Sequence, residues 1–114
     1  MKHVMRLNGQ PFEMIKSGEK TIELRLYDEK RKSIQLGDEI EFVHSLDEKQ
    51  RLRCIVLKLY VFSSFDELYA NLPLLKCGYT LENISLASPK DMEKYYSLEE
   101  QEKYGVVGIE LKVL

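Results

Sequence analysis

The most informative part of the chain is a charged segment of eight residues that contains Gly18, Lys20, Glu23 and Arg25. Side chains two positions apart share one face of a strand, so Glu23 and Arg25 are expected about 7 Å apart at ~3.3 Å per residue. Lys20, at the entrance to such a strand, can reach the same space. The spacing therefore predicts that two cations and one carboxylate meet at one place.

This combination supports several kinds of chemistry. Arg25 and Lys20 can bind a phosphate or a carboxylate, and Glu23 can accept hydrogen bonds from a base amino group or a ribose hydroxyl. In a water-poor cleft, Lys20 can lose its proton and act as a base or a nucleophile. The alternative interpretation is an exposed cluster of salt bridges, which contributes about 0–1 kcal/mol to stability.

The elements on either side of this segment must position it. A short strand over residues 3–7 precedes a helix that can begin at Pro11 and end at Gly18, because proline is tolerated in a first helical turn and glycine forms a common C-cap. Residues 21–26 alternate between apolar and polar side chains, which predicts a strand. We expect its charged side chains to project into a solvent-connected cleft, on the face opposite the apolar ones.

The remaining segments predict further strands and helices. Residues 28–33 read as a charged loop and residues 39–43 as a strand. Residues 52–62 read as a long strand whose apolar positions shift parity, as at a β-bulge or in a strand that is covered on both faces. Helical segments are expected after three serines that can cap them: Ser64, Ser88 and Ser97. With a closing strand near the C-terminus, one shared core is expected from Ile22, Leu24, Ile40, Phe42, Val107, Ile109 and Leu111. The pattern predicts an α+β barrel of about five to six strands.

Composition narrows the class of protein. The 114 residues are 44% hydrophobic and 32% charged, which fits a single globular domain over residues 1–114. The net charge of −2 argues against bulk attraction to nucleic acid. Residues 1–60 nevertheless hold 12 Lys and Arg against 10 Asp and Glu, so an anionic ligand is expected to meet this half. The alternative is that so small an asymmetry has no functional meaning.

Location and cofactors are predicted by what the sequence lacks. No apolar run approaches the ~20 residues of a membrane span, and no signal-peptide core follows Met1. Cys54 and Cys77 have no metal-ligand spacing and indicate a reduced compartment. A cytoplasmic protein without a metal ion or another cofactor is therefore expected.

Aromatic side chains can provide stacking surfaces for bases. Tyr27 directly follows the charged strand and is the tyrosine that we expect to contribute to ligand binding. Six further tyrosines can contribute in the same way: Tyr60, Tyr69, Tyr79, Tyr95, Tyr96 and Tyr104.

The charged segment resembles a known family signature. Residues 18–25 match the pattern G-x-K-x-x-E-x-R of the ASCH family, and the flanking segments MIKSGEKTIELR, GDEIEF and YGVVGIELKV are similar as well. The resemblance covers essentially the whole chain and implies a PUA-like barrel. It also implies that Gly18, Lys20, Glu23 and Arg25 line a cleft that binds RNA or a nucleotide-derived ligand.

Two other functions remain open at this point. Some small bacterial ASCH proteins are amidohydrolases that act on N-acetylated cytidine, and the resemblance implies a catalytic lysine, threonine and glutamate for them. Lys20 is present here, but Glu23 stands at the threonine position and no carboxylate directly precedes Thr80. In an enzyme, Lys20 and Glu23 would be the catalytic residues. The other possibility is a module that binds a peptide or a small anion.

The expected exposure of the charged segment leads to a prediction about stability. A partly exposed ion pair stabilises a protein little. Replacing Lys20 or Arg25 with alanine is therefore expected to abolish ligand binding while leaving the melting temperature nearly unchanged.

Overall fold

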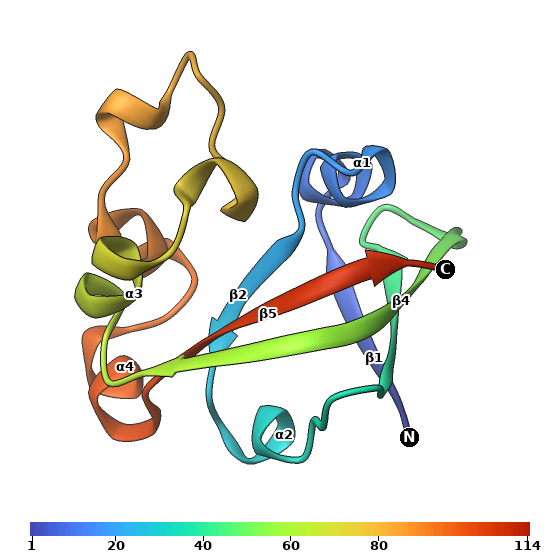
Figure 1. Ribbon diagram of the computed structural model, residues 1–114, viewed down its shortest axis with the longest axis horizontal. Helices are drawn as coiled ribbons and strands as arrows, with labels where there is room; N and C mark the ends of the chain where they lie inside the picture. The colour runs from blue at the N-terminus through green and yellow to red at the C-terminus, as the bar shows by residue number, and fades with distance from the viewer.

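A computed structural model describes residues 1–114 as five strands with helices between and beside them (Figure 1). The elements are β1 (Lys2–Leu7), α1 (Gly9–Ser17), β2 (Ile22–Leu26), α2 (Glu29–Lys32), β3 (Glu39–His44), β4 (Asp47–Phe62), α3 (Phe65–Asn71), the 3-10 helices η1 (Leu74–Cys77), η2 (Ile84–Leu86) and η3 (Pro89–Lys94), α4 (Leu98–Tyr104) and β5 (Val106–Val113). Figure 1 shows α3, α4 and the 3-10 helices gathered beside β2, at the end of the sheet away from both termini.

The strands form one sheet in the order β1-β3-β4-β5-β2. β1 pairs in parallel with β3, and the other neighbours are antiparallel. The register of β4 against β5 shifts between Val56 and Lys58, which confirms the expected bulge in this long strand. A bulge bends a strand and increases its twist, and the sheet curls into a half-barrel. The predicted α+β class and PUA-like barrel are thus confirmed, with five strands.

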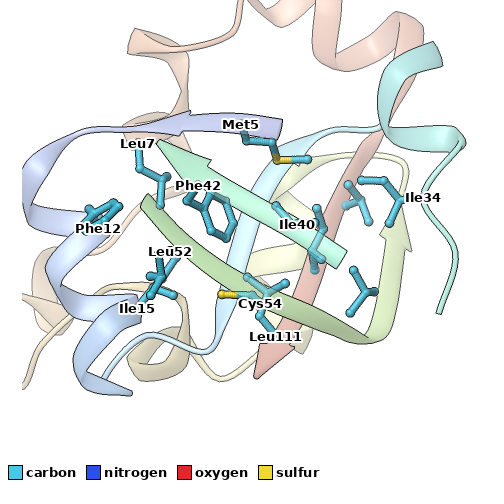
Figure 2. Close-up of a cluster of buried hydrophobic side chains, with 13 residues drawn as sticks. Met5, Leu7, Phe12, Ile15, Ile34, Ile40, Phe42, Leu52, Cys54 and Leu111 are labelled. Carbon is cyan, nitrogen blue, oxygen red and sulfur yellow. The ribbon is translucent and has the colours of Figure 1, made fainter. Parts of the chain in front are cut away.

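The apolar residues form two clusters instead of the single core that the sequence predicted. The larger cluster of 13 residues includes Ile40, Phe42 and Ile109, and Figure 2 shows Phe12 and Ile15 of α1 closing one end of it. The smaller cluster joins the apolar side chains of β2 to α3 and η3. Its members are Ile22, Leu24, Leu26, Phe65, Leu68, Leu72, Cys77, Met92 and Val106.

The register of β2 explains the division. Glu23 pairs with Ile109 and Arg25 pairs with Val107, and directly paired residues share one face of a sheet. The charged side chains of β2 therefore lie on the face that carries the larger cluster, while Ile22 and Leu24 point to the other face, under α3. The predicted alternation is correct, but assigning Ile22 and Leu24 to the same core as Val107 and Ile109 was wrong, because the apolar face of β2 packs under α3 in a separate cluster.

A helix replaces one predicted loop. Residues 28–33 contain α2, which begins because the Asp28 side chain accepts a hydrogen bond from the backbone N–H of Arg31 at 3.1 Å. The three predicted serine caps are present, since the hydroxyls of Ser64, Ser88 and Ser97 each accept a hydrogen bond from a backbone N–H in the first turn. The segment after Ser88 winds as a 3-10 helix.

Candidate functional site

The structure brings the three charged residues of the signature into direct contact. Lys20 Nζ lies 2.7 Å from Glu23 Oε1, and Arg25 Nε donates to Glu23 Oε2 at 2.7 Å. The Glu23 side chain is only 5% exposed, and those of Lys20 and Arg25 are 10% and 13% exposed. The sequence predicted a partly exposed ion pair, and that prediction is wrong. The carboxylate is therefore almost completely removed from water and in contact with both cations.

Backbone geometry places Lys20 at this point. α1 ends at Gly18, whose φ of +87° is the left-handed conformation that glycine adopts readily. The chain then reverses, and the N–H of Lys20 donates to the carbonyl of Met14 at 3.0 Å. Gly78, also at positive φ, packs against the side chain of Lys20, and a Cβ there would lie 3.3 Å from Lys20 Cδ. Lys20 is thus held between the end of α1 and the turn after η1.

The carboxylate and the guanidinium stabilise each other's charged form. Burial alone would raise the pKa of Glu23, but the charges of Lys20 and Arg25 outweigh it and hold the pKa below its ordinary value. Burial acts to lower the pKa of Arg25, and contact with Glu23 raises it above the usual value. Arg25 is also fixed by a 2.9 Å hydrogen bond from Nη2 to the carbonyl of Arg6. At neutral pH, Glu23 is an anion and Arg25 a cation.

These residues form the floor of a cleft of about 620 Å³. One wall comes from the end of β1 and the start of α1, and the other comes from α3 and the segment between η1 and α4. The lining contains four tyrosines, Tyr69, Tyr79, Tyr95 and Tyr96. The volume falls in the ~300–1,000 Å³ range of small-molecule sites.

A chain of hydrogen bonds organises the tyrosine wall. The hydroxyls of Tyr69 and Tyr79 lie 2.7 Å apart, and the Tyr79 hydroxyl donates to Asp91 Oδ2 at 2.7 Å. Burial and these two contacts raise the pKa of Tyr79, so its hydroxyl keeps its proton. Tyr96 stacks on Phe65 with ring centroids 6.3 Å apart. Buried contacts therefore anchor this wall, although much of the segment after η1 is exposed.

Three of the five predicted binding residues line the cleft, and two do not. Lys20, Glu23 and Arg25 line the cleft. Gly18 lies at the C-cap of α1 and Tyr27 packs against the larger core cluster with Lys32 Nζ 5.8 Å from its ring, and neither lines the cleft. Their roles in ligand binding stay predictions.

Sequence reasoning did not single out the second wall. Tyr79 and Tyr96 were two of six candidate tyrosines, and Asp91, which follows the predicted Ser88 cap, was not among the candidate site residues. The available signal was the Ser88–Asp91 spacing, which indicates a capping box but not what the carboxylate faces.

No group of three or more His, Cys, Asp or Glu side chains is arranged to hold a metal ion. No helix is both long enough and apolar enough to cross a bilayer.

Comparisons with known proteins agree with this architecture. The chain is similar to the hypothetical protein PH0355, with 36% identity, a TM-score of 0.83 and 100% coverage of both chains. It is also similar to protein PF0455 from Pyrococcus furiosus, with 35% identity, a TM-score of 0.76 and coverage of 100% of this chain and 98% of that chain. Among curated proteins, no significant match is found.

More distant structures share the fold. The ASCH protein from Zymomonas mobilis is 14% identical, with a TM-score of 0.67 over 97% of this chain and 66% of that chain. A model of the ASCH domain family matches residues 5–114. The chain therefore belongs to the ASCH domain family.

Proposed function

We propose that the cleft binds an unpaired nucleotide, either within RNA or as a nucleotide-derived ligand. The observation that carries the proposal is that a buried Lys20–Glu23–Arg25 cluster and four tyrosines line the same cleft. Recognition of single-stranded RNA commonly combines aromatic stacking with hydrogen bonds to base edges. The ASCH family is commonly linked to RNA binding, which supports the same class of ligand.

Arg25 retains a donor for such a ligand. Its Nε is committed to Glu23 and its Nη2 to the Arg6 carbonyl, while Nη1 has no partner in the chain. Nη1 is not buried, since the one buried side-chain polar atom without a partner is Arg31 Nε. A fixed guanidinium in the cleft lining with one amino group free of partners suits a phosphate or a carbonyl oxygen of a base.

The cationic side chains outside the cleft indicate that only a short stretch of nucleic acid is bound. Arg51 and Arg53 on β4 are paired with Glu41 and Glu39 across to β3, at 2.7 and 2.6 Å. Lys2 is paired with Glu41 in the same way. The positive charge of the N-terminal half is therefore largely neutralised on the sheet surface and offers no continuous track for a duplex. One or two phosphate contacts at the cleft are expected.

The cluster suits binding better than amide hydrolysis. Each oxygen of Glu23 already has a cationic donor, and Lys20 is in contact with one of them. A lysine nucleophile or base needs a free amine. Binding in the cytoplasm is consistent with two free, buried thiols, Cys54 and Cys77.

Titration calorimetry with nucleoside 5′-monophosphates and a short single-stranded RNA tests the proposal. Arg25→Gln is expected to weaken binding at least tenfold, whereas the matched control Arg53→Gln, which removes an arginine from an exposed ion pair, leaves it unchanged. Affinity should fall roughly three- to sevenfold between 50 and 200 mM salt, as for one or two phosphate contacts. Equal effects of the two variants, or no binding of any nucleotide by the wild-type protein, would contradict it.

A further inference from the structure

The cleft contains a second carboxylate in a different electrostatic setting. Asp91 and Glu23 are the two acidic side chains in its lining. Glu23 contacts two cations, whereas Asp91 forms no ion pair within 4.0 Å. Asp91 is half-buried on the wall opposite the start of α1. It is therefore the one anion of the cleft that no cation neutralises by direct contact.

The two oxygens of Asp91 have separate roles. Oδ2 accepts the Tyr79 hydroxyl at 2.7 Å and the backbone N–H of Ser88 at 3.2 Å. Oδ1 accepts no hydrogen bond in the chain and is not buried. Two donors therefore fix the plane of the carboxylate, and its free oxygen is held ready for a ligand. A capping box needs only the bond to Ser88, so the cap leaves Oδ1 unexplained.

We propose that Asp91 is a ligand-binding residue that selects a hydrogen-bond donor. This assignment of Asp91 rests on the proposed function and completes it. Arg25 contacts an acceptor or anionic part of the ligand, and Asp91 Oδ1 accepts a hydrogen bond from a neutral donor. In a nucleotide that donor is an exocyclic amino group of the base or a ribose hydroxyl. A carbonyl oxygen or a phosphate at the same place would face a carboxylate that no cation contacts directly, which disfavours it.

The Asp91→Asn variant gives a directional test. The Tyr79 hydroxyl and the Ser88 N–H both require an acceptor, so the amide oxygen is expected to take the place of Oδ2. The amide NH2 then takes the place of Oδ1 and faces the cleft as a donor. The substitution therefore replaces an acceptor with a donor while keeping the shape and the cap.

Calorimetric titration with three pairs of probes separates the two sources of the donor. Two pairs, adenosine with inosine monophosphate and cytidine with uridine monophosphate, differ in that an amino group is replaced by a carbonyl. The third pair, adenosine with 2′-deoxyadenosine monophosphate, differs in that a ribose hydroxyl is removed. The wild-type protein is expected to prefer the donor-bearing member of at least one pair roughly tenfold, the lower end for a hydrogen bond to a charged group. Asp91→Asn should abolish that preference, and invert it where the partner carries a carbonyl.

Matched controls isolate the carboxylate from the cap. Glu100→Gln changes the corresponding residue of the capping box at Ser97, outside the cleft lining, and should leave all ratios unchanged. Ser88→Ala removes the hydroxyl cap but keeps Asp91, and should lower only the melting temperature. If Asp91→Asn does not fold, Tyr79→Phe, which frees the carboxylate to rotate, should reduce the same ratio severalfold.

The outcomes distinguish the two proposals. Nucleotides that bind with equal ratios in the wild-type protein and in Asp91→Asn would overturn the assignment of Asp91 and leave the proposed function intact. A wild-type protein that binds no nucleotide would overturn both. A ratio that changes for the amino pairs identifies the base as the donor, and one that changes for the deoxy pair identifies the ribose.

Discussion

Replacement of Lys20 with methionine is expected to destabilise the protein substantially, because it removes one of two cations from a buried carboxylate. Methionine keeps most of the volume of the lysine stem, so the lost contact to Glu23 at 2.7 Å dominates. Loss of a hydrogen bond to a charged group costs about 1.5–3 kcal/mol, and loss of a partner from a buried ion pair costs about 3–5 kcal/mol. Since Arg25 remains, we expect roughly 2–4 kcal/mol.

Thermal and urea unfolding measure this cost. At ~4 °C per kcal/mol for a domain of this size, the melting temperature should fall by roughly 8–16 °C. The Lys20→Met/Glu23→Gln double variant should recover part of the loss, since it no longer buries a half-neutralised carboxylate. A loss below about 1 kcal/mol at pH 7, the value for an exposed pair, would refute the argument from burial.

The pH dependence of the same variant provides a second check. In the wild-type protein the folded pKa of Glu23 is depressed, so its stabilising contribution is present above the unfolded pKa of ~4.3 and is lost as pH falls below it. Without Lys20, burial opposes ionisation more strongly. The free-energy difference between Lys20→Met and the wild-type protein should therefore shrink as pH is lowered from 7 to 4. A difference that grows over this range would contradict the assignment.

Two further predictions concern the core and the N-terminal end of the sheet. Phe42→Ala should cost about 3–5 kcal/mol because the side chain is fully buried, whereas Val61→Ala, at a position that is 49% exposed, should change stability by under ~0.5 kcal/mol in urea unfolding; similar losses would contradict the division of the strands into buried and exposed positions. Hydrogen bonds from His3 and from the Gln35 N–H hold the pKa of Asp38 to about 2, so its contribution is present above pH ~4 and is lost as pH falls toward 2. The stability advantage of the wild-type protein over Asp38→Asn should disappear over that interval of acid titration, and an advantage that persists at pH 2 would show that charge is not its source.

Local patterns predicted the elements well because each has a physical cause in a few neighbouring residues. The alternation of residues 21–26 reflects the two-residue period of a strand, and Gly18 ends α1 because it can adopt a positive φ. The parity shift within residues 52–62 corresponds to the register shift after Val56. These features depend on sequence separation of only a few residues.

Contacts between segments that are far apart in the sequence were predicted less well. The sequence assigned Ile22 and Ile109 to one core, but α3 covers the outer face of β2 and creates a second cluster. Glu23 lies on the opposite face of β2, where its side chain is only 5% exposed beside Lys20 and Arg25, whereas the sequence predicted a partly exposed ion pair. Asp91 lies 68 positions after Glu23 in the chain, and only the folded structure brings both into one cleft.

We propose that Lys20, Glu23 and Arg25 form the floor of a nucleotide-binding cleft. An NMR titration with adenosine monophosphate, following the backbone amides and the Arg25 Nε–H signal, tests it directly. We expect the Arg25 Nε–H signal and the amide signals of Lys20, Gly78 and Tyr96 to shift together with one dissociation constant, while the amide signals around Arg53 do not shift. Shifts confined to the outer face of β3 and β4, with the Arg25 Nε–H signal unchanged, would contradict it.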